Sequence, residues 1–437
     1  MENTIIKQIS NQEEIVWINP YKAPFESVKG VCELTVSDED IADAHARLLR
    51  FAPFIEKAFP ETKETNGLIE SPMVEIENMK KALEENYNCE VPGKMLLKMD
   101  SHLAVAGSVK ARGGIYEVLN HAERLALKHN KISINDNYAK FAEPEMKEFL
   151  SQFTIQAGST GNLGMSIGIM SAALGFKVKI HMSADAKQWK KDLLRSKGVE
   201  VLEYKDDYSA AVANGRAESD LDPNSYFVDD EQSIILFIGY ATAAKRFAEQ
   251  LDEMGITVDE KHPLIMYMPT GVGSAPGGIF YGVKRIFGDN AHCFFVETTP
   301  CPSVLLGIVT QKHENANVHD YGIEGNTEAD GLACASPSGI VTRLLTNNIS
   351  GEFTVKDAKL YDYLRLLNSV ENIRIEPSSC SAFIGPCNLL SSEAGKEYCN
   401  NAGLSKEILE NATQVVWATG GKLIPDDIYT KYLETFM

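Results

Sequence analysis

Short apolar runs, each followed by a turn and a helical stretch, recur along the chain from about residue 95. The runs are MLLKMD, FTIQA, VKIHM, EVLEY, SYFVD, LIMYMP, CFFVET and QVVWAT. Their length and composition predict short buried strands. Because strands and helices alternate, the pattern predicts an α/β fold with mostly parallel sheets that are covered by helices.

The first 95 residues have a different character, since they are charged and helical in pattern. Ser37 is a suitable N-cap ahead of the acidic residues 38–40. An apolar stripe follows and predicts a helix that Pro53 stops. Its members are Ile41, Ala44, His45, Leu48, Leu49 and Ala52. We therefore expect residues 1–95 to form a helical extension that packs on the large domain without chemistry of its own.

The net charge narrows the range of partners. The 437-residue chain has 42 lysines and arginines against 61 aspartates and glutamates, a formal charge of −19. Such an acidic chain is not expected to bind nucleic acid or an anionic membrane. Two long uncharged windows, residues 149–176 and 263–283, contain glycines and polar side chains that are unsuited to a membrane span. Because no export signal is visible, we expect a cytoplasmic protein.

Eight cysteines are present, at positions 32, 89, 293, 301, 334, 380, 387 and 399. None belongs to a C-x-x-C pair or has the Cys/His spacing of a zinc site. In a chain of this size that is expected in the cytoplasm, we interpret them as reduced thiols, mostly in the core.

Two loops that follow predicted strands are rich in glycine and hydroxyl groups, and ligands of α/β sheets bind at such loops. The loop Thr270–Gly278 leaves backbone N–H groups unshielded ahead of a helix that is expected over 279–287, so it can hold an anion. The loop Gly158–Gly164 precedes another helix and can clamp a carboxylate with its N–H groups and hydroxyls. A tight turn without ligand and an ordinary helix cap are the alternatives.

Lys110, in AGSVKARGG, stands near the start of a helix that is expected over 111–127. A helix N-terminus disfavours a cation and so favours the free amine, which forms Schiff bases. A solvated surface lysine is the alternative. A reactive lysine, a carboxylate clamp, a phosphate cradle and a hydroxyl at the end of a strand are together what a pyridoxal 5′-phosphate (PLP) enzyme needs to act on an amino acid.

The chain contains, in this order, the motifs SHLAVAGSVKARGG, AGSTGNLG, PTGVGSAPGG, ADGLA, EPS and VVWATGG. On these motifs it resembles the D-serine dehydratase (D-serine ammonia-lyase) branch of the fold-type II, tryptophan synthase β-like PLP enzymes. The resemblance implies a two-domain α/β fold. We expect a large PLP-binding domain at 96–113 and 225–437, and a smaller inserted α/β domain at 114–224.

The resemblance also implies roles for individual residues. Lys110 would form the Schiff base with the cofactor and is the first candidate for the base, with Thr160 as a candidate acid/base partner. The substrate carboxylate would be bound by Ser159, Thr160, Gly161 and Asn162, and Asn162 would also face the cofactor. The cofactor phosphate would be bound by Gly271, Val272, Gly273, Ser274 and Ala275. The Thr419 hydroxyl would meet the pyridine nitrogen.

Two features of this set affect the chemistry. The family has glycines where Ser274 and Ala275 stand, which raises the question of whether the backbone needs a positive φ there. A hydroxyl at Thr419, unlike a carboxylate, does not keep a proton on the ring nitrogen, which predicts direct loss of the substrate's β-hydroxyl. The implied reaction is the conversion of D-serine to pyruvate and ammonia, and of D-threonine to 2-oxobutanoate.

Three acidic residues complete the predicted site. Asp230, at the end of a predicted strand, is a candidate substrate contact, with an exposed strand end as the alternative. By the resemblance, Glu297 and Asp330 are candidate ligands of K⁺ or a similar cation, and structural carboxylates are the equal alternative.

Two other functions stay open. One is dehydration of L-serine or L-threonine, or racemisation of serine, on the same fold, since the D-stereochemistry comes only from the resemblance. The other is a non-catalytic phosphate- or nucleotide-binding protein that uses the Thr270–Gly278 loop. The resembling branch is usually monomeric, so we expect a monomer that acts on a small molecule.

Overall fold

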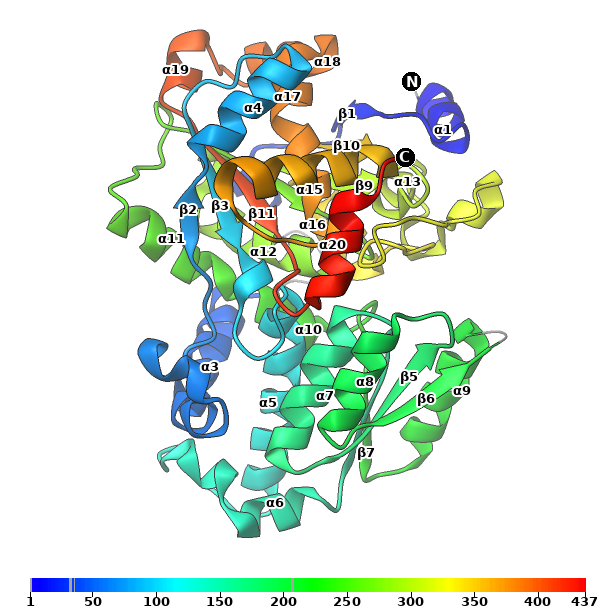
Figure 1. Cartoon of the computed structure of the whole chain (residues 1–437). Coiled ribbons are helices and arrows are strands. Elements are labelled where there is room, and N and C mark those ends of the chain that lie inside the picture. The colour runs from blue at the N-terminus through cyan, green and yellow to red at the C-terminus, as the bar shows by residue number, and fades with distance from the viewer. Residues whose placement is uncertain (1, 31–33, 35, 206–207) are drawn as a thin grey trace. The chain divides into compact units, whose positions relative to one another are not determined.

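The computed structural model (Figure 1) describes residues 2–30, 34, 36–205 and 208–437, which form two compact units. The first unit contains residues 1–37, 71–102 and 240–437, and the second contains residues 38–70 and 103–239. This division differs from the expected domains. Residues 38–70, 103–113 and 225–239 belong to the second unit, whereas we expected them with the large domain.

The first unit is built on a seven-stranded sheet with the strand order β1-β10-β9-β8-β11-β3-β2. The strands are β1 (Val16–Ile18), β2 (Met73–Glu75), β3 (Lys94–Met99), β8 (Leu264–Pro269), β9 (Ala291–Thr298), β10 (Gly351–Val355) and β11 (Thr413–Ala418). The five inner strands are parallel, and β1 and β2 pair antiparallel at the two edges.

Helices and short 3₁₀ turns surround this sheet. The α-helices are α1 (Glu2–Ser10), α2 (Phe25–Val28), α4 (Glu77–Tyr87), α11 (Ala243–Glu253), α12 (Ser274–Phe287), α13 (Ser303–Val309), α14 (Gly339–Leu345), α15 (Asp357–Glu371), α16 (Pro377–Cys380), α17 (Ile384–Ser391), α18 (Glu393–Asn401), α19 (Lys406–Glu410) and α20 (Asp426–Glu434). A further helix, α10 (Ile234–Ala241), leads from the second unit into the first.

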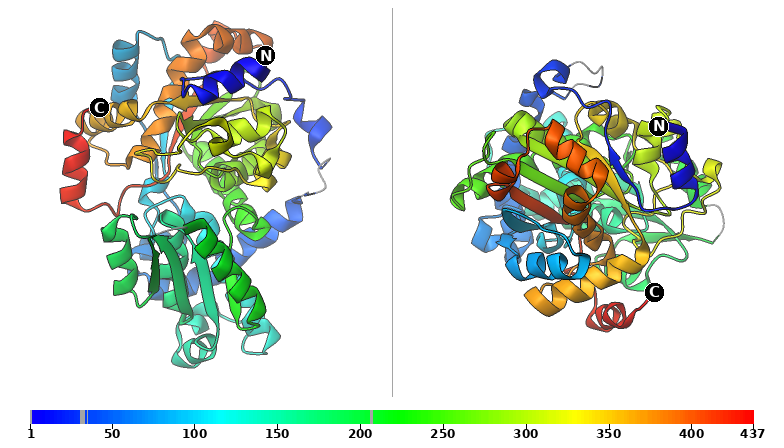
Figure 2. Two further views of the ribbon diagram at one scale, coloured as in Figure 1. Left: turned by 90° about the vertical axis from the view of Figure 1, so that its right-hand side faces the viewer. Right: turned by 90° about the horizontal axis from the view of Figure 1, so that it is seen from above.

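The second unit contains a four-stranded parallel sheet with the order β6-β5-β4-β7. The strands are β4 (Thr154–Gly158), β5 (Lys177–Ser183), β6 (Glu200–Tyr204) and β7 (Ser225–Val228). The helices are α3 (Asp38–Ala58), α5 (Lys110–Lys128), α6 (Pro144–Leu150), α7 (Asn162–Leu174), α8 (Gln188–Ser196) and α9 (Tyr208–Leu221). Helices lie on both faces of this sheet (Figure 2). The predicted α/β class with parallel-rich, helix-covered sheets is confirmed.

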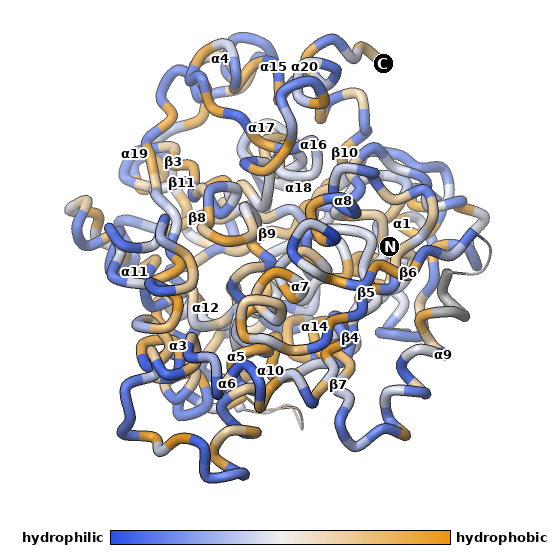
Figure 3. The backbone as a smooth tube through the Cα atoms, turned by 60° about the horizontal axis from the view of Figure 1, so that its bottom comes forward, coloured by the Kyte–Doolittle hydropathy of each residue, from blue (hydrophilic) through white to orange (hydrophobic). Residues whose placement is uncertain are grey.

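Hydrophobic residues are concentrated in the sheets. Every residue of β8, β9, β10 and β11 is buried. In Figure 3 the backbone around β8 is largely orange, whereas α4 alternates between hydrophilic and hydrophobic residues. In the part of the chain that the structure describes, no helix combines the length and the apolarity that a membrane crossing requires.

Pro53 does not stop the first long helix as predicted, because α3 continues through it to Ala58. The buried face of α3 also differs from the predicted stripe, since Leu49 is 47% exposed while Phe51 and Phe54 are fully buried. These two rings pack against Tyr138 and Phe141, with centroids 4.7 to 6.3 Å apart. We infer that this aromatic packing offsets the cost of an internal proline, about 3 kcal/mol.

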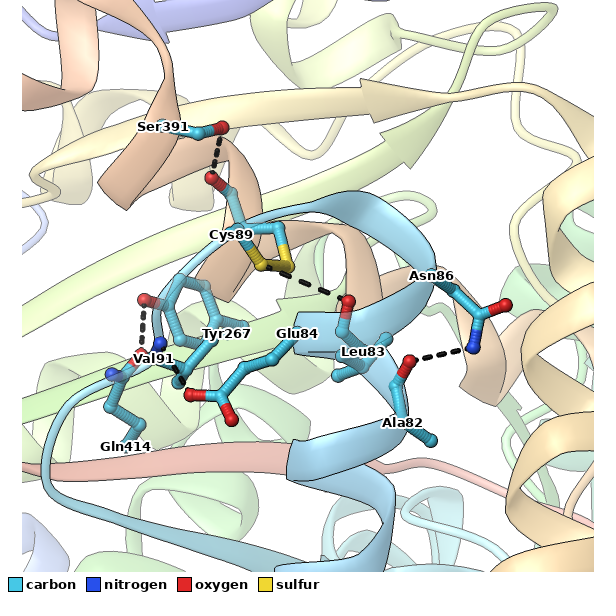
Figure 4. The surroundings of a disulfide bond; sticks show 10 residues. Ala82, Leu83, Glu84, Asn86, Cys89, Val91, Tyr267, Ser391 and Gln414 are labelled. Atoms are coloured by element: carbon cyan, nitrogen blue, oxygen red, sulfur yellow. Dashed lines mark hydrogen bonds between the residues drawn. A yellow bond between two sulfur atoms is a disulfide. The ribbon is translucent and has the colours of Figure 1, made fainter.

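Two cysteines form a disulfide, contrary to the expectation of reduced thiols (Figure 4). Cys89 follows α4 and Cys387 lies in α17; their Cα atoms are 5.6 Å apart although 298 residues separate them in sequence. Spacing along the chain could not reveal the pair, because tertiary packing brings α4 and α17 together. Among the described residues, the cysteines at 293, 301, 334, 380 and 399 form no disulfide, and Cys32 lies outside the described residues.

Candidate active site

Lys110 lies at the start of a helix as predicted, and it is itself the first residue of α5, one residue before the expected start. Its Nζ lies 2.6 Å from Oδ2 of Asp230, which follows β7 in the same unit. The two side chains are 18% and 21% exposed, so the pair is accessible to a small molecule. The structure therefore brings together two of the predicted site residues, in an ion pair that the sequence did not predict.

The loop between β4 and α7, predicted to bind a carboxylate, is half-buried from residue 158 to residue 162. Gly161 is the N-cap of α7, and no side chain caps the helix. Ser159 Oγ instead accepts a hydrogen bond from the Gly161 N–H at 3.3 Å, within the loop. An ordinary Ser/Thr cap, the alternative interpretation of this loop, is therefore not formed at the N-cap of α7.

The predicted phosphate loop lies in the first unit, after β8, and all of its residues are buried. Gly273, at φ +101°, is the N-cap of α12 and also has no side-chain cap. The helix begins at Ser274 and not at Ile279, so Ser274 and Ala275 are in its first turn. Only Gly273 in this loop has a positive φ, which answers the question raised by Ser274 and Ala275.

The surroundings of the loop leave little room for a side chain at Gly271 or Gly273. A Cβ at Gly271 would come within 2.9 Å of the Gly331 carbonyl oxygen, and one at Gly273 within 3.0 Å of Val341. Backbone N–H groups therefore line the loop at the start of a helix, where the helix dipole attracts an anion.

Thr419 directly follows β11 and is only 7% exposed. The Ser379 and Thr419 hydroxyls are 3.2 Å apart, and Ser379 Oγ also accepts a hydrogen bond from the Gly420 N–H at 2.7 Å. The Glu376 N–H donates to the Gly420 carbonyl at 3.0 Å. Sequence reasoning missed Ser379, although it directly follows the EPS motif.

The phosphate loop and Thr419 emerge at the same edge of the seven-stranded sheet. They follow β8 and β11, which are parallel neighbours. This carboxyl edge is where α/β sheets bind ligands. The edge combines an anion cradle with a neutral hydroxyl, which fits a phosphorylated aromatic ring such as PLP.

Glu297, a predicted cation ligand, is fully buried on β9. Its carboxylate accepts hydrogen bonds from the N–H groups of Val304 (2.9 Å) and Leu305 (3.0 Å), in the first turn of α13. Burial raises the pKa of Glu297 to about 7. Burial and the neighbouring Glu297 raise the pKa of Glu352, on β10, well above its ordinary value.

The second predicted cation ligand is Asp330, which follows the buried Ala329. Asp330 is half-buried and lies beside Gly331, whose N–H donates to Ser378. The acidic neighbour of Glu297 is Glu352, which sequence reasoning missed. No group of three or more potential metal-binding side chains (His, Cys, Asp or Glu) occurs among the described residues.

Comparison with known proteins identifies the family of this chain. The model of the family described as pyridoxal-phosphate dependent enzyme matches residues 65–397. A probable D-serine dehydratase from Fusobacterium nucleatum is 54% identical over 437 residues, covering 100% of this chain and 98% of the relative. A probable D-serine dehydratase from Bacillus thuringiensis is 50% identical, covering 99% of this chain and 96% of the relative.

The fold matches solved structures at low identity. Diaminopropionate ammonia lyase from Escherichia coli superposes with a TM-score of 0.70 at 18% identity, covering 96% of this chain and 97% of that chain. The same lyase in complex with D-serine gives a TM-score of 0.67 at 18% identity and the same coverage. These matches concern the fold alone, whereas the family model and the close relatives cover most or all of the chain. The chain belongs to the family of pyridoxal-phosphate-dependent enzymes.

Proposed function

We propose that this chain is a PLP-dependent lyase that removes water from D-serine and releases pyruvate and ammonia, with D-threonine as a second substrate that yields 2-oxobutanoate. The substrate is supported by relatives that are half-identical over the full length and are called probable D-serine dehydratases. The observation that carries the assignment of the site is the ion pair between Lys110 Nζ and Asp230 Oδ2 at 2.6 Å.

The residues present fit the cofactor. When bound, PLP supplies an aldehyde that joins an amine and a ring that accepts electrons from the substrate carbon. In our proposal Lys110 provides the amine, and the N–H groups of the 271–275 loop hold the phosphate. Ser274 adds a hydroxyl to that loop. Thr419 offers the ring nitrogen a neutral hydroxyl, which does not keep a proton there and so favours direct loss of the β-hydroxyl.

Lys110 is the proposed base. Its amine takes the proton from the substrate's α-carbon, and Asp230 lies close enough to exchange a proton with Nζ directly. Thr160 is a second acid/base candidate, because its hydroxyl belongs to the half-buried loop that binds the substrate in this proposal.

The loop Ser159–Asn162 is the proposed carboxylate site. No side chain caps α7, so its first-turn N–H groups are suited to an anion. The hydroxyls of Ser159 and Thr160 and the amide of Asn162 add neutral hydrogen-bonding groups that orient an amino acid.

Pyruvate release from D-serine and from L-serine tests the proposal. We expect the purified protein to be yellow and to prefer D-serine. The Lys110→Ala protein should lose the yellow absorption and about a thousandfold in kcat. A preference for L-serine would favour the alternative reaction. A colourless protein that borohydride does not label would favour the non-catalytic phosphate-binding alternative, against which the family membership already argues.

A cation beside Glu297 is a separate part of the proposal. Two fully buried carboxyls, Glu297 and Glu352, lie side by side, and either a shared proton or a monovalent cation can offset their charge. The Asp330 ligand inferred from the family pattern remains part of the proposal. An increase in kcat on replacing Na⁺ by K⁺, absent in Glu352→Gln, would support the cation.

We also propose that the enzyme is a cytoplasmic monomer. The resemblance to a usually monomeric branch supports the oligomeric state, and the composition of the chain supports the compartment. Sedimentation analysis of the purified protein tests the first of these proposals.

A further inference from the structure

A second acidic residue on α5 connects this helix to the segment that contains Asp230. Glu117 lies two turns after Lys110 and is 1% exposed. Its Oε1 accepts a hydrogen bond from the Tyr226 hydroxyl at 2.7 Å, and its Oε2 accepts one from the Ser233 hydroxyl at 2.7 Å. Tyr226 is in β7, and Ser233 directly precedes α10. One carboxylate therefore fixes both ends of the segment 226–233 to α5.

Between these two anchors the chain is held by its own hydrogen bonds. Asp229 Oδ1 accepts the Glu231 N–H at 3.0 Å, and the Asp229 carbonyl accepts the Ser233 N–H at 3.0 Å. Arg216 on α9 pairs with the other Asp229 oxygen at 2.8 Å. The Ser233 hydroxyl also accepts the Leu236 N–H at 3.1 Å and so caps α10. Asp230 lies within this hydrogen-bonded turn. The position of its carboxylate therefore depends on how Tyr226 and Ser233 hold the segment to α5.

We propose that Glu117 is a positioning residue, which anchors the segment 226–233 so that the Asp230 carboxylate stays in contact with Lys110 Nζ. The inference rests on the proposed function, which assigns Lys110 as the cofactor-binding amine and the base. It adds a residue that contacts neither substrate nor cofactor and acts only through Asp230.

The electrostatics of Glu117 agree with this role. Burial raises the pKa of Glu117 to about 7, and the two hydroxyl donors oppose that rise. The ionised carboxylate accepts both O–H bonds, whereas a protonated carboxyl must donate from one oxygen, which weakens one anchor. The titratable groups that act on the Glu117 carboxyl are Tyr226 on β7 and Asp229 and Asp230 in the turn. The charged groups around these residues are Arg124 on α5, Glu231 in the turn and Arg216 on α9.

The experiment measures how fast PLP modifies Lys110 in the cofactor-free full-length protein, with borohydride trapping and peptide mass spectrometry. Glu117→Gln removes the charge, and Ser233→Ala removes one anchor while leaving the charge. Glu123→Gln is the matched control, because Glu123 lies on the same helix, is also 1% exposed, and binds Arg47 and Tyr138 instead.

We expect Glu117→Gln and Ser233→Ala to raise the labelling rate at least threefold, because a Lys110 amine that the Asp230 carboxylate no longer holds can reach the PLP aldehyde more readily. Glu123→Gln should leave the rate unchanged. Equal rates in all four proteins would overturn the inference. A change in Glu117→Gln alone would assign the effect to charge and not to position. An equal change in the control would assign it to general loosening of α5.

A second measurement uses the holoenzyme. In both anchor variants kcat for D-serine should fall about tenfold with KM within twofold, and in Glu117→Gln the kcat profile should lose a step near pH 7. A KM effect without a kcat effect would contradict the positioning role. If the wild-type protein releases no pyruvate, the proposed substrate fails while the labelling rates still decide the inference. If PLP does not label wild-type Lys110, both fail.

Discussion

At the scale of single residues, several buried polar groups of this chain are paired with hydroxyls and not with ions. Glu117 accepts from Tyr226 and Ser233, and the Ser379 and Thr419 hydroxyls are within hydrogen-bonding distance of each other. His292 is bound through Nδ1 to the Tyr398 hydroxyl at 2.7 Å. A hydroxyl partner can donate or accept, so it satisfies a buried group without fixing its charge.

His292 yields a prediction about acid stability. Burial lowers its pKa to about 3, and Lys22 and Lys284 add to the lowering. The unfolded residue titrates near pH 6.5, so between pH 6.5 and 3 the unfolded chain binds a proton that the folded chain does not. This contribution is fully retained above pH 6.5 and is lost as the pH falls. The free energy of unfolding should decrease by about 2 kcal/mol from pH 7 to pH 5.

The measurement is urea unfolding at both pH values for the wild type and for His292→Gln, which should lose most of that difference. His262→Gln is the control, because the His262 side chain is 43% exposed. If the wild type and His292→Gln lose the same stability in acid, another group is responsible for the loss.

Sequence reasoning at this scale found groups whose position follows from local pattern. Lys110 at a helix start and the two glycine loops are of this kind. It missed pairs of residues that are distant in sequence: Asp230 with Lys110, Ser379 with Thr419, and Glu352 with Glu297. No local rule connects residues separated by tens of positions, so these pairs needed the three-dimensional structure.

At the scale of elements, α12 shows how the two ends of one helix serve different purposes. Glycines with positive φ stand at both caps, Gly273 at +101° and Gly288 at +56°. At Gly273 a Cβ would meet Val341 at 3.0 Å, whereas at Gly288 it would meet nothing within 4 Å. Backbone conformation alone explains the second glycine. Gly273 is required both by its positive φ and by the close packing of Val341 at the proposed phosphate site.

Replacing Gly273 and Gly288 by alanine, one at a time, should therefore separate an effect on PLP binding from an effect on folding stability. Gly288→Ala should lower the free energy of unfolding by about 1 kcal/mol and leave PLP affinity unchanged. Gly273→Ala should weaken PLP binding at least tenfold, because the added methyl group displaces the N–H groups that hold the phosphate. PLP titration followed by absorbance, together with thermal unfolding, distinguishes the two. Equal PLP affinity in both variants would remove the loop from the phosphate site.

The elements that sequence reasoning placed correctly have a strong local signal. All eight predicted strands are present, because each is a compact apolar run. Three strands were not predicted. β1 and β2 are three-residue edge strands, which leave almost no pattern. β10 is a five-residue inner strand whose polar residues Glu352 and Thr354 interrupt the apolar run. The start of α12 was placed five residues late, because Ser274–Gly278 reads as a loop by composition although it forms the first helical turn. Helix α3 was also predicted to end at Pro53 but continues to Ala58, because tertiary packing, which the sequence pattern does not show, stabilises it.

At the scale of the whole molecule, the amino-terminal extension is divided between the two units. Residues 38–70 join the second unit, where α3 packs on α5 and on an aromatic cluster. The remainder joins the first unit, where β1 and β2 close opposite edges of the seven-stranded sheet. Both edge strands are only three residues long, so they leave few unpaired backbone groups that could promote association. We expected the extension to pack on the large domain alone, because composition does not show which partner an apolar face will find.

The disulfide between Cys89 and Cys387 also acts at this scale, because it joins segments 298 residues apart. A cross-link over so long a loop restricts the unfolded chain strongly, and it should contribute about 2 to 5 kcal/mol to the free energy of unfolding. Guanidinium unfolding with and without reductant tests this contribution. Reductant should destabilise the wild type. It should also destabilise the control variant Cys399→Ser, because Cys399 is a buried cysteine that is not part of the disulfide. It should have no such effect on Cys387→Ser.

Thiol titration of the denatured protein gives an independent reading, because the untreated chain should show two fewer thiols than the reduced chain. Disulfides are rare in the reducing cytoplasm. If protein isolated from the cytoplasm under non-reducing conditions shows all eight thiols, the two sulfurs face each other without a bond, and the proposed compartment stands. If two thiols are missing, the disulfide survives isolation. Either the compartment is then more oxidising than we propose, or the burial of Cys387, which is 6% exposed, protects the disulfide from reductants.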